Sequence, residues 1–185
     1  MSKKDRFLRF LAGIAGFVVI GVCSFSCTSI PEGLSPVENF DSQAYLGTWY
    51  EIARFDFKFE RGLSKVTANY SLNPDGSIKV LNRGFNQEKG KWQEAKGKAK
   101  FRGADNVGAL KVSFFGPFYT GYNVLKIDED YSCALVGGKD YNYLWILART
   151  PEISEELKVE YLAYAESLGY DTSRLLWVSH DDTAL

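Results

Sequence analysis

Side chains suited to nucleophilic or acid–base chemistry are few in this chain. It contains three cysteines, Cys23, Cys27 and Cys133, and a single histidine, His180. His180 follows the last strand that the sequence predicts, where a solvated surface residue is expected. Cys133 fits a small strand residue, with a reactive thiol as the alternative. No G-x-S-x-G elbow, H-E-x-x-H pair, phosphate-binding glycine loop or cysteine pair is present. The sequence therefore predicts a protein that is not an enzyme and has no metal or cofactor.

Cys27 is placed for a different chemistry, the attachment of a lipid. A positively charged head (residues 3–9) precedes an apolar run of 13 residues, 10–22. That run is too short to span a membrane comfortably and is typical of a secretory signal. A cut before Cys27 would make it the new N-terminus, where its thiol could carry a diacylglycerol. We therefore expect a lipoprotein signal peptide at 1–26, a lipidated tether at 27–39 and a single domain at 40–185.

The residues around this cysteine resemble a known sorting motif. Ser24-Phe25-Ser26-Cys27 is similar to the lipobox of bacterial lipoproteins, although Ser24 stands where that family usually has leucine. In that family an aspartate directly after the cysteine marks retention in the inner membrane, and Thr28 is not an aspartate. The resemblance thus implies a lipid anchor in the outer membrane, with the domain facing the periplasm. An ordinary secretory signal or an N-terminal anchor helix is the alternative.

The composition limits the class of protein and of partner. Removal of 1–26 from the 185 residues leaves 159, the size of one domain, and moves the formal net charge from −1 to about −4. No basic patch indicates a nucleic-acid partner. Only Cys133 would remain besides the lipid-bearing Cys27, so no disulfide framework is expected. The hydrophobic content of 45% and aromatic content of 15% suffice for a buried core.

Short runs of alternating apolar residues predict an all-β fold. Strong turn signals separate several of them, notably Asn73-Pro74-Asp75-Gly76 and Asp128-Glu129-Asp130. Each run is joined to the next by a short connection, and such a meander closes most simply as an eight-stranded antiparallel up-and-down barrel. The expected strands are 48–55, 65–72, 77–85, 92–101, 109–115, 122–127, 132–137 and 143–149.

One helix is expected after the eighth strand. Ser154 is a suitable N-cap, and two glutamates follow in the first turn, where the helix dipole favours negative charge. An apolar face and a C-terminal glycine, Gly169, complete the pattern. This helix should pack on the outside of the barrel, before a short ninth strand at 175–178. The face consists of Leu157, Tyr161, Ala165 and Leu168.

Side-chain parity predicts which residues face the inside of the barrel. In the fourth run Ala95, Gly97 and Ala99 share one face, and three lysines share the other. Because the lysines should face water, three very small residues should face inward and leave room for a ligand. Aromatic strand residues are more often ordinary core, so a barrel filled by its own side chains remains an alternative. The expected ligand-binding residues are Val66, Ala68, Tyr70, Val80, Asn82, Ala99, Val112, Phe114, Val124, Tyr143, Trp145 and Leu147, with Glu51 also inward.

Three segments resemble the lipocalins, and specifically the bacterial lipocalin of outer membranes, which is related to the apolipoprotein D group. They are GTWYEIARFDFKFERG (47–62), ALKVSFFGPFYTGYNV (109–124) and YLWILARTPEIS (143–154). The resemblance implies that Trp49 plugs the closed end of the barrel, that Arg149 packs across its ring, and that Gly47 lets the backbone pass close to the indole. It also implies an apolar and positively charged mouth, formed by Phe55, Phe57, Lys58 and Arg61.

The same resemblance implies a function. Bacterial lipocalins are thought to bind fatty acids and lysophospholipids and to help maintain the envelope under stress. A long acyl chain suits an apolar barrel, because each buried methylene contributes about 0.8 kcal/mol. The alternatives are a carrier of a pigment or haem, and a structural envelope lipoprotein. The segment FFGPFYTGY, with Phe115, Phe118 and Tyr119, is the natural surface for a partner or for a homodimer contact.

Overall fold

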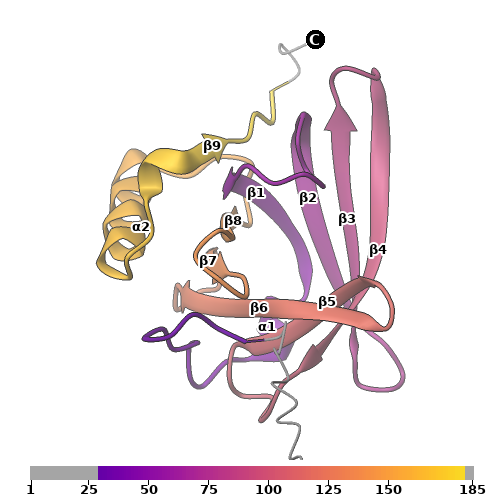
Figure 1. Ribbon diagram of the computed structural model, residues 1–185, viewed down its shortest axis with the longest axis vertical. Coiled ribbons are helices and arrows are strands. Elements are labelled where there is room, and N and C mark those ends of the chain that lie inside the picture. Colours follow the sequence, from indigo (N-terminus) through magenta and orange to yellow (C-terminus); the bar gives the residue numbers. More distant parts are fainter. Residues whose placement is uncertain (1–28, 182–185) are drawn as a thin grey trace, which may run out of the picture.

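The computed structural model describes residues 29–181, so Cys27 and the expected signal peptide lie outside the described residues. The chain forms a closed antiparallel barrel of eight strands (Figure 1). Consecutive strands pair from β2 to β8, β8 pairs with β1, and β1 pairs with β2 to close the ring. The predicted meander is confirmed. The strands are β1 Gly47–Phe55, β2 Leu63–Leu72, β3 Ile78–Asn86, β4 Lys91–Phe101, β5 Ala109–Phe115, β6 Phe118–Ile127, β7 Cys133–Gly137 and β8 Leu144–Ala148.

The connections alternate between the two ends of the barrel. The β1–β2, β3–β4, β5–β6 and β7–β8 loops lie at one end, and the other three lie at the opposite end with the short helix α1, Ser42–Tyr45. Asp41 caps α1, since its Oδ1 accepts from the backbone nitrogen of Gln43 at 2.8 Å. This helix was not predicted, because four residues carry too short a pattern.

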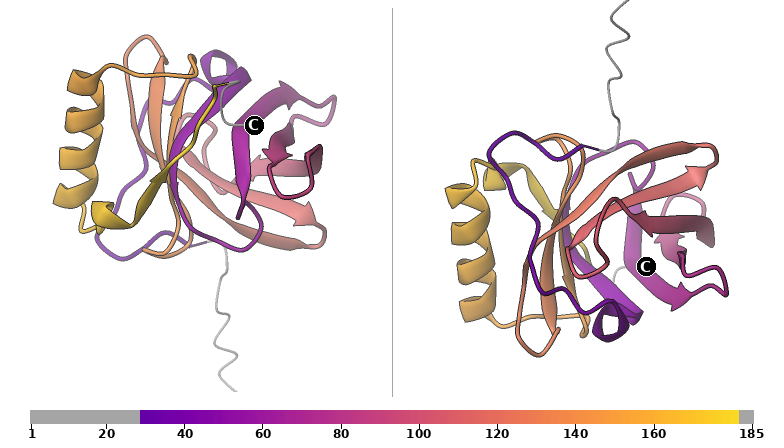
Figure 2. Two further views of the ribbon diagram at one scale, coloured as in Figure 1. Left: turned by 90° about the horizontal axis from the view of Figure 1, so that it is seen from above. Right: turned by 90° about the horizontal axis from the view of Figure 1, so that it is seen from below.

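The predicted outer helix is present as α2, Glu155–Ser167. Ser154 Oγ accepts from the nitrogen of Leu157 at 3.2 Å, which confirms the predicted N-cap. The helix lies on one side of the barrel, and β9, Leu175–Trp177, returns from it to pair with β1 (Figure 2). The one-turn helix η1, Thr172–Arg174, connects them. Tyr161 and Ala165 are fully buried against the barrel wall.

The buried residues form two clusters, separated by the wall of the barrel. One cluster lies inside the barrel around Trp49, and the other lies between α2 and strands β1, β7 and β8. A β-bulge in β1 decides which cluster receives each residue. The register shifts between Glu51 and Ala53, so one extra residue reverses the alternation beyond that point. Arg54 therefore turns inward and Phe55 turns outward.

The prediction that Phe55 lies at the mouth of the barrel is therefore wrong. The Phe55 side chain is fully buried in the outer cluster. Its ring packs against Tyr170, with a centroid distance of 6.2 Å, and the guanidinium of Arg174 lies 4.6 Å from its centroid. The bulge that moved it could not be read from the alternation of residue types.

Candidate ligand-binding cavity

The barrel encloses a cavity of about 540 Å³, which is within the range of small-molecule sites. Its wall is mostly apolar, and it opens at the end of the β1–β2, β5–β6 and β7–β8 loops. Almost every residue expected to bind the ligand does line this space. These residues are Val66, Ala68, Tyr70, Val80, Asn82, Ala99, Val112, Phe114, Tyr143, Trp145 and Leu147, together with Glu51.

Only two of the three small inward residues of β4 line the cavity. Ala95 and Ala99 line the cavity as expected. Gly97 does not leave empty space, because a Cβ there would lie 2.9 Å from Cδ1 of Phe114. The phenyl ring of Phe114 thus covers Gly97, and the room for a ligand comes from the two alanines.

Val124 departs from the prediction. It faces inward, but it is completely buried beside Gly108 and Val37 and does not border the cavity. The N-terminal segment crosses the barrel there, since the nitrogen of Val37 donates to the Val124 carbonyl at 2.8 Å. The inward direction of the Val124 side chain was predicted correctly. Its separation from the cavity depends on the N-terminal segment, which is far away in the chain.

The mouth also differs in charge from the prediction. Phe57 lines the cavity, but Lys58 and Arg61 do not. Arg61 points into solvent and pairs with Asp56, with Nη2 2.9 Å from Oδ2. The loop instead turns Phe59 and Glu60 toward the cavity. The expectation of a positive loop over the mouth is therefore wrong for the side chains that border the cavity.

Trp49 closes the far end of the barrel. Its side chain is fully buried, and Nε1 donates to the Tyr45 carbonyl at 2.8 Å. The guanidinium of Arg149 lies 3.9 Å from the ring centroid, in the predicted position. Gly47 has a φ of +97°, a conformation that favours glycine, and a Cβ there would touch only Arg149 Nη1, at 3.4 Å. The glycine is thus needed for its backbone conformation and not for a close approach to the indole.

Replacing Arg149 should destabilise the closed end of the barrel. Arg149 donates to the carbonyls of Ala44 at 2.6 Å, Thr48 at 2.9 Å and Tyr131 at 3.2 Å. Arg149→Met removes these bonds and the cation–π contact, so the free energy of unfolding should fall by about 2–4 kcal/mol in urea titrations. Arg83→Met is the matched control, because Arg83 stacks on Trp92 at 4.1 Å but is half exposed. An equal loss in both variants would contradict this account.

Three tyrosine hydroxyls meet on the inner wall, deep in the cavity. The hydroxyl oxygens of Tyr45 and Tyr122 are 2.6 Å apart, and those of Tyr70 and Tyr122 are 2.9 Å apart. Burial raises the pKa of all three phenols, so each keeps its proton. Three hydroxyl hydrogens serve two mutual bonds, so one hydrogen is left to donate to a further acceptor. Sequence reasoning missed both Tyr45, which comes from the unpredicted helix α1, and Tyr122, which begins the predicted strand 122–127 but was not among the expected ligand-binding residues.

A buried ion pair lies on the wall below the β1–β2 loop. Arg54 Nη1 is 2.6 Å from Glu51 Oε1, and both side chains are almost completely buried. Arg54 Nη2 also donates to the carbonyls of Glu60 at 2.8 Å and Leu63 at 3.2 Å. The indole Nε1 of Trp145 donates to Glu60 Oε2 at 3.3 Å. Arg54 thus pairs with the Glu51 carboxyl and bonds only the backbone of Glu60, whose carboxyl accepts from Trp145 instead.

The stability of the protein should depend on the protonation of Glu51. Burial, and then the nearby Glu60 carboxylate, raise the pKa of Glu51 well above its ordinary value of 4.5. The folded chain then holds a proton that the unfolded chain releases. The free energy of unfolding should therefore fall as the pH rises from about 4.5 toward the folded pKa.

Glu51→Gln tests this dependence, because glutamine binds no proton in either state. Urea unfolding across that pH range should show a flatter slope for Glu51→Gln than for the parent chain. Glu94→Gln is the control for the substitution itself, since the Glu94 side chain is 51% exposed. A parent slope retained in Glu51→Gln would show that another group binds the proton.

The histidine and the buried cysteine both have structural surroundings that do not suit catalysis. His180 is half buried, not solvated as expected, and its Nε2 lies 2.9 Å from the Glu51 carbonyl. Burial raises the pKa of the Cys133 thiol to about 12, which disfavours the reactive thiolate. Between residues 29 and 181 no group of three or more His, Cys, Asp or Glu side chains is arranged to hold a metal ion. None of the helices described there has the length and apolar character needed to cross a membrane.

Comparisons with known proteins agree with this geometry. The family model described as a lipocalin-like domain matches residues 40–180. The outer membrane lipoprotein Blc of Escherichia coli K12 is 56% identical over 167 residues, which cover 90% of this chain and 93% of that protein. The Vibrio cholerae protein of the same name is 48% identical over 162 residues, 87% of this chain and 95% of that one. Apolipoprotein D of Rattus norvegicus is 36% identical over 166 residues, 85% of each chain.

Solved structures show the same fold at low sequence identity. Insecticyanin from the tobacco hornworm Manduca sexta superposes with a TM-score of 0.65 at 20% identity, covering 85% of this chain and 89% of that one. The cockroach allergen Per a 4 gives a TM-score of 0.65 at 17% identity, covering 82% and 94%. These two likenesses bear on the fold alone.

Proposed function

The chain belongs to the lipocalin-like family, and from that premise we propose that it is an outer-membrane lipoprotein that binds single-tail lipids. Its work is binding rather than catalysis, and it stores or carries these lipids for envelope maintenance under stress. The observation that carries the proposal is the apolar cavity of about 540 Å³, open at one end. The relatives named outer membrane lipoprotein support the location, together with the lipobox-like residues before Cys27.

The charges at the cavity wall favour a lysophospholipid over a fatty acid. Glu51 and Glu60 border the cavity near the β1–β2 loop, and Arg54 pairs with the carboxyl of Glu51 but bonds only the backbone of Glu60. A fatty-acid carboxylate placed beside the Glu60 carboxylate would be repelled, whereas the ammonium of a zwitterionic head would be attracted. The acyl tail then runs toward Trp49, and the head stays at the mouth.

A second ligand class is favoured by the tyrosine hydroxyls. A fatty acid that enters head first would bring its carboxylate to the spare donor of Tyr45, Tyr70 and Tyr122. In that case Tyr122→Phe should lower retention of palmitate severalfold and leave retention of a lysophospholipid nearly unchanged. Equal retention of palmitate by both chains would rule out this head-first mode.

Native mass spectrometry of a chain that begins at Thr28 tests the proposed function. Spectra are recorded as purified and after addition of lysophosphatidylethanolamine or palmitate. Retention of one lysophospholipid per chain, in preference to palmitate, is expected. A chain that carries no lipid and takes up neither additive would contradict the binding function. The lipid anchor is tested separately by metabolic labelling with an alkyne fatty acid, which should label the parent chain and not Cys27→Ser.

A further inference from the structure

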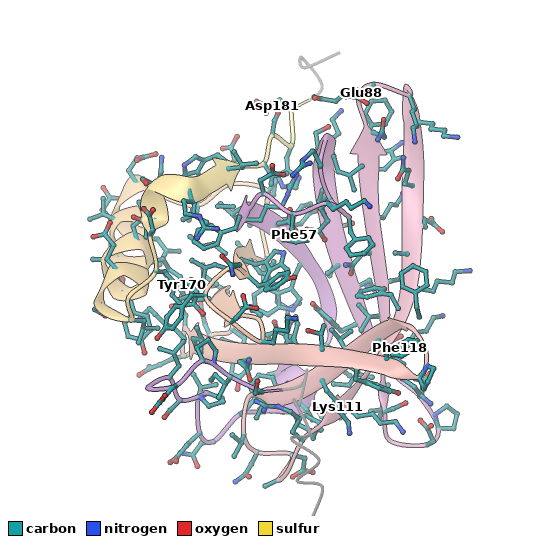
Figure 3. All side chains as sticks on the ribbon, viewed as in Figure 1. Phe57, Glu88, Lys111, Phe118, Tyr170 and Asp181 are labelled. Carbon is teal, nitrogen blue, oxygen red and sulfur yellow. The ribbon has the colours of Figure 1, made fainter. Side chains whose placement is uncertain are left out.

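Three exposed phenylalanines surround the mouth of the cavity. Phe59 is 78% exposed, Phe115 is 73% exposed and Phe118 is 80% exposed, and all three border the cavity opening. Phe115 and Phe118 face each other across the two-residue turn between β5 and β6. Figure 3 shows Phe118 at the tip of this hairpin, projecting away from the barrel. Apolar side chains gathered at one exposed site mark an interaction surface.

The described chain begins at this same end of the barrel. The hydroxyl of Tyr141 donates to the Glu32 carbonyl at 3.3 Å. Tyr141 belongs to the β7–β8 loop, which supplies Gly138, Lys139 and Tyr143 to the cavity lining. Figure 2 shows the first described residues beside this loop, at the end opposite α1. The N-terminal segment thus starts at the mouth and runs toward the closed end.

The segment after Glu32 is fixed to the barrel and provides no slack. Leu34 is 8% exposed and Phe40 is 3% exposed. The Phe40 nitrogen donates to the Asn106 carbonyl at 2.8 Å, and the Val37 nitrogen donates to Val124 at the same distance. Releasing this segment would uncover both side chains and break these bonds. A tether from Cys27 can therefore use only the few residues before Glu32.

The length of that tether restricts how far the mouth can be from an anchored lipid. Cys27 precedes Glu32 by five residues. A fully extended chain spans at most about 3.3–3.6 Å per residue, so the tether reaches roughly 17 Å. A lipid on Cys27 must enter the bilayer within that distance of the β7–β8 loop. The closed end cannot then face the membrane.

We propose that Phe59, Phe115 and Phe118 form a bilayer-docking surface that holds the mouth of the cavity against the membrane. The inference rests on the proposed acylation of Cys27, because the short tether selects the bilayer as the occupant of this surface. A docked mouth lets a single-tail lipid pass between bilayer and cavity without crossing water. The three rings add apolar contact at the depth where the tether already brings the loops.

Fluorescent labels at the two ends of the barrel test the orientation. The processed, acylated chain is reconstituted into phosphatidylcholine vesicles, with an environment-sensitive dye on Phe59→Cys or on Phe118→Cys. Ala104→Cys is the matched control, since Ala104 is exposed in the β4–β5 loop at the closed end. Cys133 stays unlabelled because it is buried and burial raises its pKa to about 12. Quenching by aqueous iodide is measured for each label.

The expected result is severalfold weaker quenching at 59 and 118 than at 104, together with a blue shift at these two positions alone. Equal quenching at all three positions, or protection at 104, would overturn the proposal. Protection at 118 that persists without vesicles and grows with protein concentration would show a second copy on this surface, and would also overturn it. If the chain does not float with the vesicles, it is not anchored to the bilayer, and this result would also overturn the proposal. No ligand is added, so failure here leaves the mass-spectrometric test of lipid binding unaffected.

Discussion

Ala99→Phe should lower the affinity for a single-tail lipid by roughly 100-fold while the barrel remains folded. Ala99 lines the cavity between Val112 of β5 and Ile78 of β3. A phenyl ring there would occupy the volume of roughly four methylenes of an acyl chain, each contributing about 0.8 kcal/mol. The lost contribution of about 3 kcal/mol corresponds to that change in affinity. The ring enters empty space rather than a packed core, so the cost in stability should be modest.

Lys100→Phe is the matched control for this substitution. Lys100 is the next residue of β4 and is exposed on the outer face. The same ring should therefore leave lipid retention unchanged there. Native mass spectrometry of both variants with lysophosphatidylethanolamine gives the comparison, and urea unfolding reports their stability. Uptake by Ala99→Phe at the level of the parent chain would show that the ligand does not occupy this cavity.

The sequence predicted the barrel because its physical pattern is local. Alternation along each strand, the turn residues between strands and the caps of α2 all lie within a few residues of one another. Parity in the regular strand β2 placed Val66, Ala68 and Tyr70 correctly at the cavity wall. It failed in β1, where the bulge after Glu51 inserts one residue and moves Phe55 to the outer cluster.

The polar features of the cavity could not be read from local patterns. Tyr45 comes from a four-residue helix and meets Tyr122, which lies 77 positions away. Glu60 belongs to a loop whose path depends on the bonds that Arg54 donates to the carbonyls of Glu60 and Leu63. A loop residue has no parity, so its side-chain direction follows only from the folded structure. The charges of Lys58 and Arg61 favour a place at the mouth, but the folded loop puts Glu60 at the cavity wall in their place.

Arg54→Met should destabilise the protein by about 3–5 kcal/mol, the usual cost of breaking a buried ion pair. The substitution leaves Glu51 without its cation and the carbonyls of Glu60 and Leu63 without their donor. Urea unfolding at neutral pH measures the loss. The loss should shrink as the pH falls through the raised pKa of the Glu51 carboxyl, because a protonated carboxyl needs no cation. Arg61→Met is the matched control, because the Arg61–Asp56 pair is mostly exposed and should contribute much less to stability.

The double variant Glu51→Leu/Arg54→Met separates the ion pair from the packing of its members. If the cost of Arg54→Met comes from an uncompensated carboxyl, removing that carboxyl as well should recover part of the stability. The two single losses would then sum to more than the loss in the double variant. Strictly additive losses would show instead that Arg54 acts through its bonds to the loop carbonyls. In that case the guanidinium mainly holds the β1–β2 loop over the mouth, and the carboxyl of Glu51 is left to face the head of a bound lipid.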